Sequence, residues 1–79
     1  MSKPVYTEIE IERERQDRIW GDGHDQTHTS NDWVAMLAKH IGKVVHFPWT
    51  PERFRYQMIV VAALAVAAIE WCDQTKRPV

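Results

Sequence analysis

The sequence lacks a disulfide to stabilise a small protein, and it lacks a strong net charge. Its one cysteine, Cys72, cannot form an intrachain disulfide, and a lone cysteine in an apolar stretch is typical of a small buried side chain in a reducing cytosol. Charged residues make up 27% of the chain, yet the net charge is only −1, which excludes the strongly basic footprint of a general nucleic-acid binder. Side-chain packing must therefore stabilise the fold, and binding of any ligand must depend on a few neighbouring side chains rather than on the overall charge.

Long hydrophobic runs are also missing. The apolar run Met58–Ile69 is shorter than the ~20 residues that a membrane-spanning helix needs. Residues Met1–Tyr6 lack the apolar region of a signal peptide. We expect a cytoplasmic protein without membrane contact, in which Met58–Ile69 belongs to a buried core helix.

Motifs that carry catalysis or hold cofactors are absent as well. There is no P-loop, GxGxxG, HExxH or zinc knuckle, and neither Ser2 nor Ser30 lies in a nucleophile-elbow motif. Cys72 has no base placed beside it by the sequence. The residues therefore predict no catalytic group and no cofactor.

The chain of 79 residues predicts a single helical domain over residues 1–79. A domain of this size buries only about 60% of its unfolded surface, and its core rarely supplies more than about 3–5 kcal/mol. Without a disulfide, we expect the missing stability to come from oligomerisation or from a partner.

Apolar spacing and capping signals predict three helices, at about residues 8–20, 31–45 and 51–73, with a loop at 21–30. Thr7 and Glu10 have the spacing of a capping box for the first helix. The stripe along that helix passes through the polar residues Glu12, Arg13 and Gln16. Either these residues face the interior and find partners, or the helix is held only at its ends.

The second and third helices have clearer signals. Ser30 or Asn31 is the expected cap of the second helix, with Asp32 favourably placed at the positive end of its dipole. Thr50 and Pro51 supply a cap and a first-turn proline for the third. Because Met58–Ile69 is apolar on every side and two short helices cannot cover it, we expect a homodimer formed through the third helix.

Two groups of residues are candidate binding sites. His24 and His28 lie four apart with Asp25 between them, which suits a metal on a helix, but the neighbouring glycines favour a loop whose polar groups make turn and cap hydrogen bonds. Lys39, His40 and Lys43 are either a solvated face with a core histidine or an anion site for phosphate-like groups. In an anion site we expect a lowered pKa for His40 and tighter anion binding below about pH 6.5.

Aromatic residues gather where the second helix connects to the third. They lie next to Arg53 and Arg55, so they suit either the packing of the connection or a surface on which a base stacks. The residues are Phe47, Trp49, Phe54 and Tyr56.

Three blocks of the chain resemble the small MazG-like proteins of phages and mobile elements. They are Glu12–Gly21 (ERERQDRIWG), Asp32–Leu37 (DWVAML) and Val61–Glu70 (VAALAVAAIE), and the resemblance covers about residues 8–73. It implies an all-α helical bundle related to dimeric dUTPases and nucleoside triphosphate pyrophosphohydrolases, with helices paired across a subunit interface. Active members of this family bind magnesium through E-E-x-x-E on one helix and E-x-x-D on the next.

The residues at those positions differ in this chain. Lys39, His40 and Lys43 occupy the first motif, and the second falls near Gln57–Val60. Magnesium prefers carboxylate and water oxygens, and two ammonium groups would repel it. We therefore expect a non-catalytic MazG-like binding or interaction protein of a phage or mobile element. The alternatives are a nucleoside triphosphate pyrophosphohydrolase with a diverged active site and an inhibitor of a host defence complex.

Overall fold

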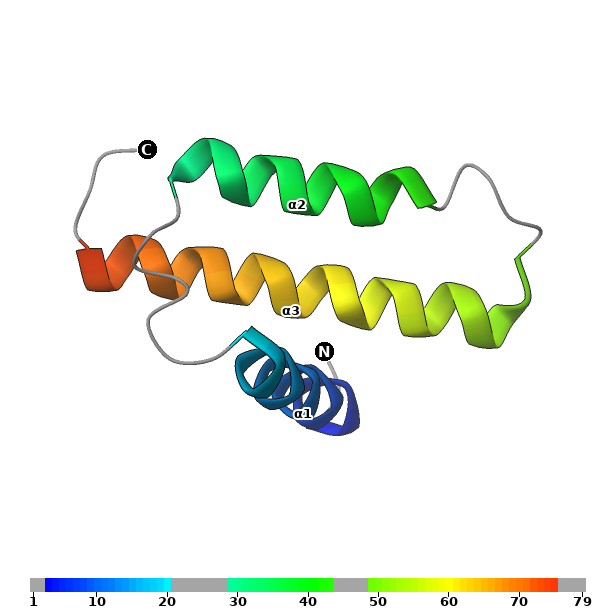
Figure 1. Cartoon of the computed structure of the whole chain (residues 1–79). Coiled ribbons are helices and arrows are strands. Elements are labelled where there is room, and N and C mark those ends of the chain that lie inside the picture. The colour runs from blue at the N-terminus through cyan, green and yellow to red at the C-terminus, as the bar shows by residue number, and fades with distance from the viewer. Residues whose placement is uncertain (1–2, 21–28, 44–48, 76–79) are drawn as a thin grey trace.

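The chain folds into three α-helices with the longest in the middle. The computed structural model describes residues 3–20, 29–43 and 49–75. They form α1 (Lys3–Trp20), α2 (Ser30–Gly42) and α3 (Pro51–Thr75), and these residues contain no strand. α2 lies antiparallel alongside α3, whereas α1 packs on another side of α3 and crosses it steeply (Figure 1). The predicted all-α class, with a long third helix at its centre, is confirmed.

The start of α1 differs from the prediction. The helix begins at Lys3, and the Thr7 hydroxyl donates a hydrogen bond of 3.1 Å to the Lys3 carbonyl one turn back. Thr7 is therefore inside the helix, and the capping box predicted from Thr7 and Glu10 is wrong. Pro4 lies in the first turn, where a proline costs no helical hydrogen bond, so the helix can begin before Thr7. The described part of the helix reaches Trp20, the predicted last residue, and the residues that follow lie outside the described ones.

The N-terminus of α2 has a capping box, but one residue earlier than predicted. Thr29 is the N-cap: its hydroxyl accepts from the Asp32 amide at 3.2 Å, and its own amide donates to the Asp32 carboxylate at 2.9 Å. The prediction of Ser30 or Asn31 as the cap is wrong, because the box needs its acidic residue three positions after the cap. The expected end at residue 45 lies outside the described residues.

The start of α3 is as predicted. The Thr50 hydroxyl accepts from the Arg53 amide at 3.2 Å, and the Thr50 carbonyl accepts from the Phe54 amide at 3.0 Å. Pro51 occupies the first helical position, and the helix continues to Thr75, two residues beyond the predicted end.

The apolar core lies along α3 and its contact with α2. Trp33 of α2 and Trp71 of α3 pack with their ring centroids 6.4 Å apart, and Ala67 lies in the same cluster. Ala63 and Ala67 of α3 are also buried, so small side chains form part of this contact. The buried apolar residues of the described chain are Trp33, Val60, Ala63, Leu64, Ala67 and Trp71.

α3 is also long and apolar enough to cross a membrane, judged by length and composition over Pro51–Gln74. That segment includes the charged residues Arg53 and Arg55 near the start of α3. A core helix of a soluble protein has the same length and composition. The expectation of a cytoplasmic protein without membrane contact therefore stays a prediction.

Candidate functional site

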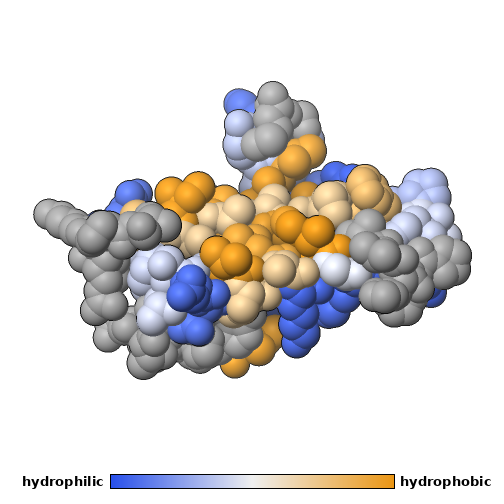
Figure 2. Space-filling view, turned by 90° about the horizontal axis from the view of Figure 1, so that it is seen from above, coloured by the Kyte–Doolittle hydropathy of each residue, from blue (hydrophilic) through white to orange (hydrophobic). Residues whose placement is uncertain are grey.

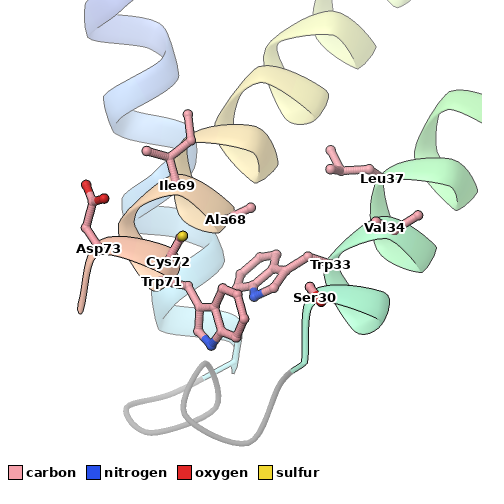
Figure 3. Close-up of a pocket in the computed structure, with 9 residues that line it drawn as sticks. All are labelled: Ser30, Trp33, Val34, Leu37, Ala68, Ile69, Trp71, Cys72 and Asp73. Atoms are coloured by element: carbon pink, nitrogen blue, oxygen red, sulfur yellow. The ribbon is translucent and has the colours of Figure 1, made fainter. Parts of the chain in front are cut away.

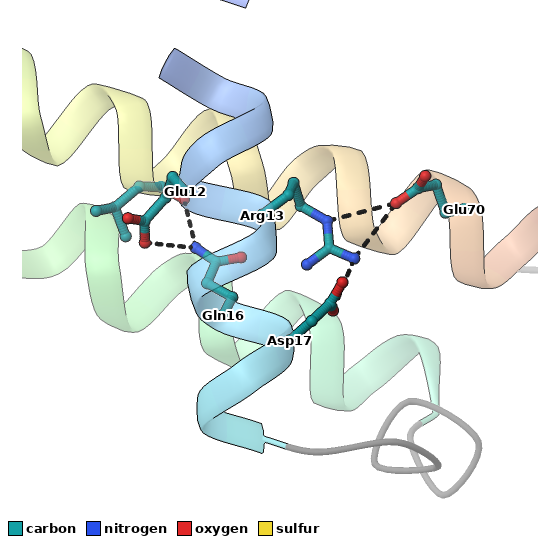
Figure 4. Close-up of polar contacts among 6 residues, drawn as sticks. Glu12, Arg13, Gln16, Asp17 and Glu70 are labelled. Atoms are coloured by element: carbon teal, nitrogen blue, oxygen red, sulfur yellow. Dashed lines mark hydrogen bonds and ion pairs between the residues drawn. The ribbon is translucent and has the colours of Figure 1, made fainter. Parts of the chain in front are cut away.

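A cluster of polar side chains lies between α1 and the rest of the molecule. Glu12 and Gln16 of α1 are the buried polar residues of the described chain, with 6% and 2% of their surface exposed (Figure 4). The polar stripe on α1 therefore faces the interior and finds partners there, which is the first of the two alternatives that the sequence left open.

Glu12 is held by two neighbours on its own helix. Its carboxylate accepts from Arg15 Nε at 2.8 Å and Nη2 at 2.7 Å, and from Gln16 Nε2 at 3.1 Å. The hydrogen bonds from Arg15 lower the pKa of Glu12 below its ordinary value, although burial acts in the opposite direction. Glu12 is therefore an ionised, fully engaged carboxylate.

Gln16 connects α1 to α3. Its Nε2 lies 3.5 Å from the Val60 carbonyl. The same Nε2 donates to Glu12 (Figure 4). Its Oε1 is buried, and no hydrogen-bond partner for it lies within the described residues. Burying a hydrogen-bond acceptor without a donor costs free energy, so Gln16 Oε1 lowers the stability of the cluster.

His40 is joined to α3 through an amide. Gln57 Nε2 donates to the His40 carbonyl at 3.1 Å and lies 3.4 Å from His40 Nδ1. Partial burial lowers the pKa of His40, and the charges of Lys43 and Lys39 lower it further, whereas Glu12 acts in the opposite direction. The predicted direction of this shift is confirmed.

A pocket of about 330 Å³ lies beside these residues, and all three helices contribute to its wall. Three basic groups meet there: Arg15 from α1, and Lys39 and His40 from α2. Apolar groups and Gln16 complete the lining. The full set is Arg15, Gln16, Ile19, Met36, Lys39, His40 and Val60, which we call the basic pocket.

Lys43 does not line the basic pocket. It lines a smaller pocket of about 210 Å³ with Trp49, Arg53, Tyr56 and Gln57. The predicted trio is thus divided: Lys39 and His40 share one pocket, and Lys43 lies with Arg53 and two aromatic rings in another.

The aromatic cluster predicted at this connection is present in part. Trp49 and Phe54 pack edge to face with their centroids 6.3 Å apart, whereas Tyr56 is more than half exposed. Phe47 lies outside the described residues. The contact between Trp49 and Phe54 supports the packing interpretation, whereas the exposure of Tyr56 leaves the stacking interpretation open for that ring.

Ion pairs fasten α1 to α3 on either side of the buried cluster. Glu8 pairs with Arg55 near the start of α3, and Arg13 pairs with Glu70 at 3.4 Å near its end. Arg13 also pairs with Asp17 at 3.1 Å on its own helix (Figure 4). Several carboxylates of the α1–α3 contact are therefore already matched by guanidinium groups.

The predicted metal candidates His24, Asp25 and His28 lie outside the described residues. Within residues 3–20, 29–43 and 49–75, no group of three or more His, Cys, Asp or Glu side chains is placed to hold a metal ion.

An apolar pocket of about 310 Å³ lies between α2 and α3, near the end of α3 (Figure 3). Val34 and Ile69 at its edge are 64% and 61% exposed. Seen from the side of α2, apolar surface runs along the middle of the molecule between polar ends (Figure 2). The lining residues are Ser30, Trp33, Val34, Leu37, Ala68, Ile69, Trp71, Cys72 and Asp73.

Sequence reasoning missed two members of the polar cluster, Arg15 and Gln57. The spacing of Glu12 and Arg15, three apart on a helix, was a usable signal for their ion pair. Nothing in the sequence signalled that Gln57 binds His40, because that contact depends on the register of α2 against α3.

Comparison with protein-family models, curated proteins and solved structures found no match for this chain.

Proposed function

We propose that this chain is a non-catalytic, MazG-like helical binding protein of a phage or mobile element, and that it binds a phosphate-class anion in the basic pocket. The observation that carries the proposal is the meeting of Arg15, Lys39 and His40 around one cavity. The Lys39 ammonium, the His40 imidazole and the Arg15 Nη1 group, which is left over from the two-point bond of Nε and Nη2 to Glu12, supply donors of three geometries to a tetrahedral anion.

The state of the carboxylates supports binding rather than metal-dependent hydrolysis. Glu12 is engaged by Arg15 and Gln16, Glu8 by Arg55, and Glu70 by Arg13. A magnesium ion needs several free oxygen ligands, and here it would have to displace a guanidinium from each of these carboxylates.

Protonation of His40 couples anion binding to pH. The pKa of free His40 is lowered by burial and by two lysines, so the imidazole is neutral at pH 7. A bound anion stabilises the charged imidazolium and raises that pKa. Binding is therefore tighter below about pH 6.5, and it weakens with salt because the lysine contact is exposed.

The test is a titration with inorganic phosphate at pH 6, followed through the His40 ring signals by NMR. We expect saturable shifts at millimolar phosphate that disappear in Lys39→Gln. Arg53→Gln is the matched control, since Arg53 lines the neighbouring pocket and, unlike Lys43, is not one of the charges that shift the pKa of His40. Absence of any shift at millimolar phosphate would make the basic groups ordinary surface charge.

The alternative is a nucleoside triphosphate pyrophosphohydrolase with a diverged active site. Glu12 is the observation that favours it, because it is the buried carboxylate of the described chain and its field reaches His40. Purified protein is incubated with dUTP, dCTP and other triphosphates plus magnesium or manganese. Pyrophosphate release that is lost in a Glu12→Gln variant shown by circular dichroism to keep its fold would establish this function and overturn the first.

We also propose that the protein is a cytoplasmic homodimer formed through α3. Ile69 is 61% exposed although it lies on the central helix, and it borders the apolar pocket with Ala68 and Cys72. A second copy packed there would remove this apolar surface from water.

A further inference from the structure

A further groove lies between α1 and the second half of α3, and the proposed anion site makes no use of it. Its volume is about 350 Å³. The α1 residues recur at helical spacing, and α3 contributes two residues four apart. The lining residues are Tyr6, Ile9, Glu10, Arg13, Glu14, Asp17, Val66 and Glu70, which we call the acidic groove.

The charge of the acidic groove is unlike that of the rest of the chain. Four carboxylates and one guanidinium line it, a formal charge of −3, although the whole chain carries only −1. The remaining residues therefore carry a net positive charge. The negative potential belongs to this groove and not to the molecule as a whole.

Two of the carboxylates are left without a cation. Arg13 pairs with Asp17 and Glu70, but Glu10 and Glu14 have no ion-pair partner within the described residues. They lie four apart on α1 and are both exposed, and like charges at this spacing repel each other and destabilise a helix. A cation placed between them relieves that repulsion. Arg13 already shows that a guanidinium fits among the carboxylates of this groove.

Apolar side chains are also accessible in the acidic groove. Tyr6 is 55% exposed, and Ile9 and Val66 are half-buried beside it. A purely ionic site would need none of these residues. Apolar groups flanked by carboxylates match the face of an amphipathic helix that carries basic residues beside its apolar stripe.

We propose that the acidic groove docks a cationic amphipathic helix of a partner protein. Two basic side chains one turn apart on that helix pair with Glu10 and Glu14, and an apolar residue between them packs on Ile9 and Val66. The partner is defined by its chemistry: lysine or arginine on one side of an apolar stripe.

The test uses a fluorescent synthetic helix of leucine and lysine, and a matched peptide in which glutamate replaces lysine. Fluorescence anisotropy gives the affinity at low and moderate salt, and NMR of the labelled wild-type protein locates the contact without any substitution. We expect the lysine peptide alone to bind, with shifts concentrated at Tyr6–Asp17 and Val66–Glu70.

Variants test the role of the two unpaired carboxylates. Glu10→Gln/Glu14→Gln is expected to weaken binding about tenfold, the loss of two exposed ion pairs. Glu52→Gln/Asp73→Asn is the matched control: it removes two exposed carboxylates outside the acidic groove and is expected to leave the affinity unchanged. Circular dichroism checks that each variant folds.

Three results would overturn the proposal. Equal loss of affinity in both double variants would mean general attraction between opposite charges. Shifts centred on the apolar pocket of α2 and α3 would place the helix elsewhere. A change of oligomeric state in the variant of Glu10 and Glu14, measured by light scattering, would make the acidic groove a contact between copies of this chain.

Discussion

At the scale of single residues, the most consequential side chain is a buried carboxylate. Burying an ionised group is costly unless partners replace the water it loses. Glu12 has those partners in Arg15 and Gln16, and Gln16 in turn reaches the backbone of α3. The same side chains that solvate Glu12 therefore also hold α1 in position.

Replacing Glu12 by alanine should destabilise the protein. Arg15 and Gln16 then lose their acceptor, and because the Arg15 side chain is 44% exposed, water replaces part of that loss. We expect the free energy of unfolding to fall by about 2 kcal/mol in urea titrations. Glu14→Ala, at an exposed position on the same helix, is the control and should change it by less than about 0.5 kcal/mol.

The same carboxylate predicts a dependence of stability on acid. The pKa of Glu12 is lower in the folded protein than its ordinary value of 4.5, so the folded state binds its proton less readily than the unfolded state. The stability that ionised Glu12 adds to the fold is present above pH 4.5, and it is lost as the pH falls through the pKa of Glu12 in the folded protein. The stability difference between wild type and Glu12→Gln should therefore shrink below pH 4.5. A difference independent of pH would mean that Glu12 is not ionised in the fold.

Protonation of His40 affects stability in a higher pH range than that of Glu12, and the charged form of His40 is a cation rather than an anion. Its pKa is lowered from 6.5, so the unfolded chain takes up the proton more readily than the folded one. Stability should therefore fall as the pH decreases through about 6.5, and His40→Asn should reduce that slope. Unfolding midpoints measured from pH 7.5 to 5 in both proteins provide the comparison, and parallel curves would contradict the shift.

At the scale of helices, the structure assigns different roles to neighbouring residues that look alike in the sequence. Thr29, Ser30 and Asn31 are all residues that cap helices well, and Thr29 is the one in position. The reason is the carboxylate three residues later, which completes a reciprocal pair with Thr29 alone.

This assignment predicts unequal effects for two similar substitutions. Thr29→Ala removes the hydroxyl that accepts from the Asp32 amide and should cost about 1 kcal/mol of stability. Ser30 lies inside the helix, so Ser30→Ala should reduce the stability much less. Thermal unfolding of both variants decides the matter, and a larger loss in Ser30→Ala would restore Ser30 as the cap.

The helices could be predicted from the sequence better than their contacts. The Thr50 cap, the proline after it and the apolar run on α3 are local signals. Such signals can be recognised in a single sequence. The start of α1 was misread because two local signals competed, the Thr7 capping pattern and Pro4. The pairing of Gln57 with His40 was not legible, because it depends on the relative register of two helices.

The candidate site was predictable to a similar extent. Lys39 and His40 were recognised from their spacing and do share a pocket. Lys43 is four residues from Lys39, yet it lies in a different pocket, which it shares with Gln57 of α3, the residue that contacts His40. Arg15 of α1 also lines this pocket. No local pattern in the sequence predicted that α1 would lie beside α2.

At the scale of the whole molecule, the apolar core is small. Within the described residues, the buried apolar side chains are on α2 and α3, and three of the six are on one stretch of α3, Val60–Leu64. α1 is held by its polar cluster and by ion pairs at both ends of the contact. A core of this size is marginal for a lone chain, which is why a second copy is expected.

The homodimer proposal predicts a measurable mass and a specific variant. Light scattering at micromolar concentration should give about twice the chain mass of 9.3 kDa. Ile69→Lys places a charge at the exposed edge of the apolar pocket and should shift the population to monomer, whereas Glu70→Gln beside it should not. A monodisperse monomer of the wild-type protein would rule the dimer out.

The contacts of α1 have a further consequence for how the chain folds during synthesis. The Gln57–His40 bond joins residues 17 apart, whereas Arg13–Glu70 and Glu8–Arg55 join residues 57 and 47 apart. Closing a longer loop costs more entropy, so α2 and α3 should pair first and α1 should dock last. On the ribosome the order is the reverse: α1 leaves the exit tunnel before α2, and α3, the helix on which α1 docks, is made after both. The sparse apolar content and dense charge of α1 suit a segment that must wait in water for the rest of the chain.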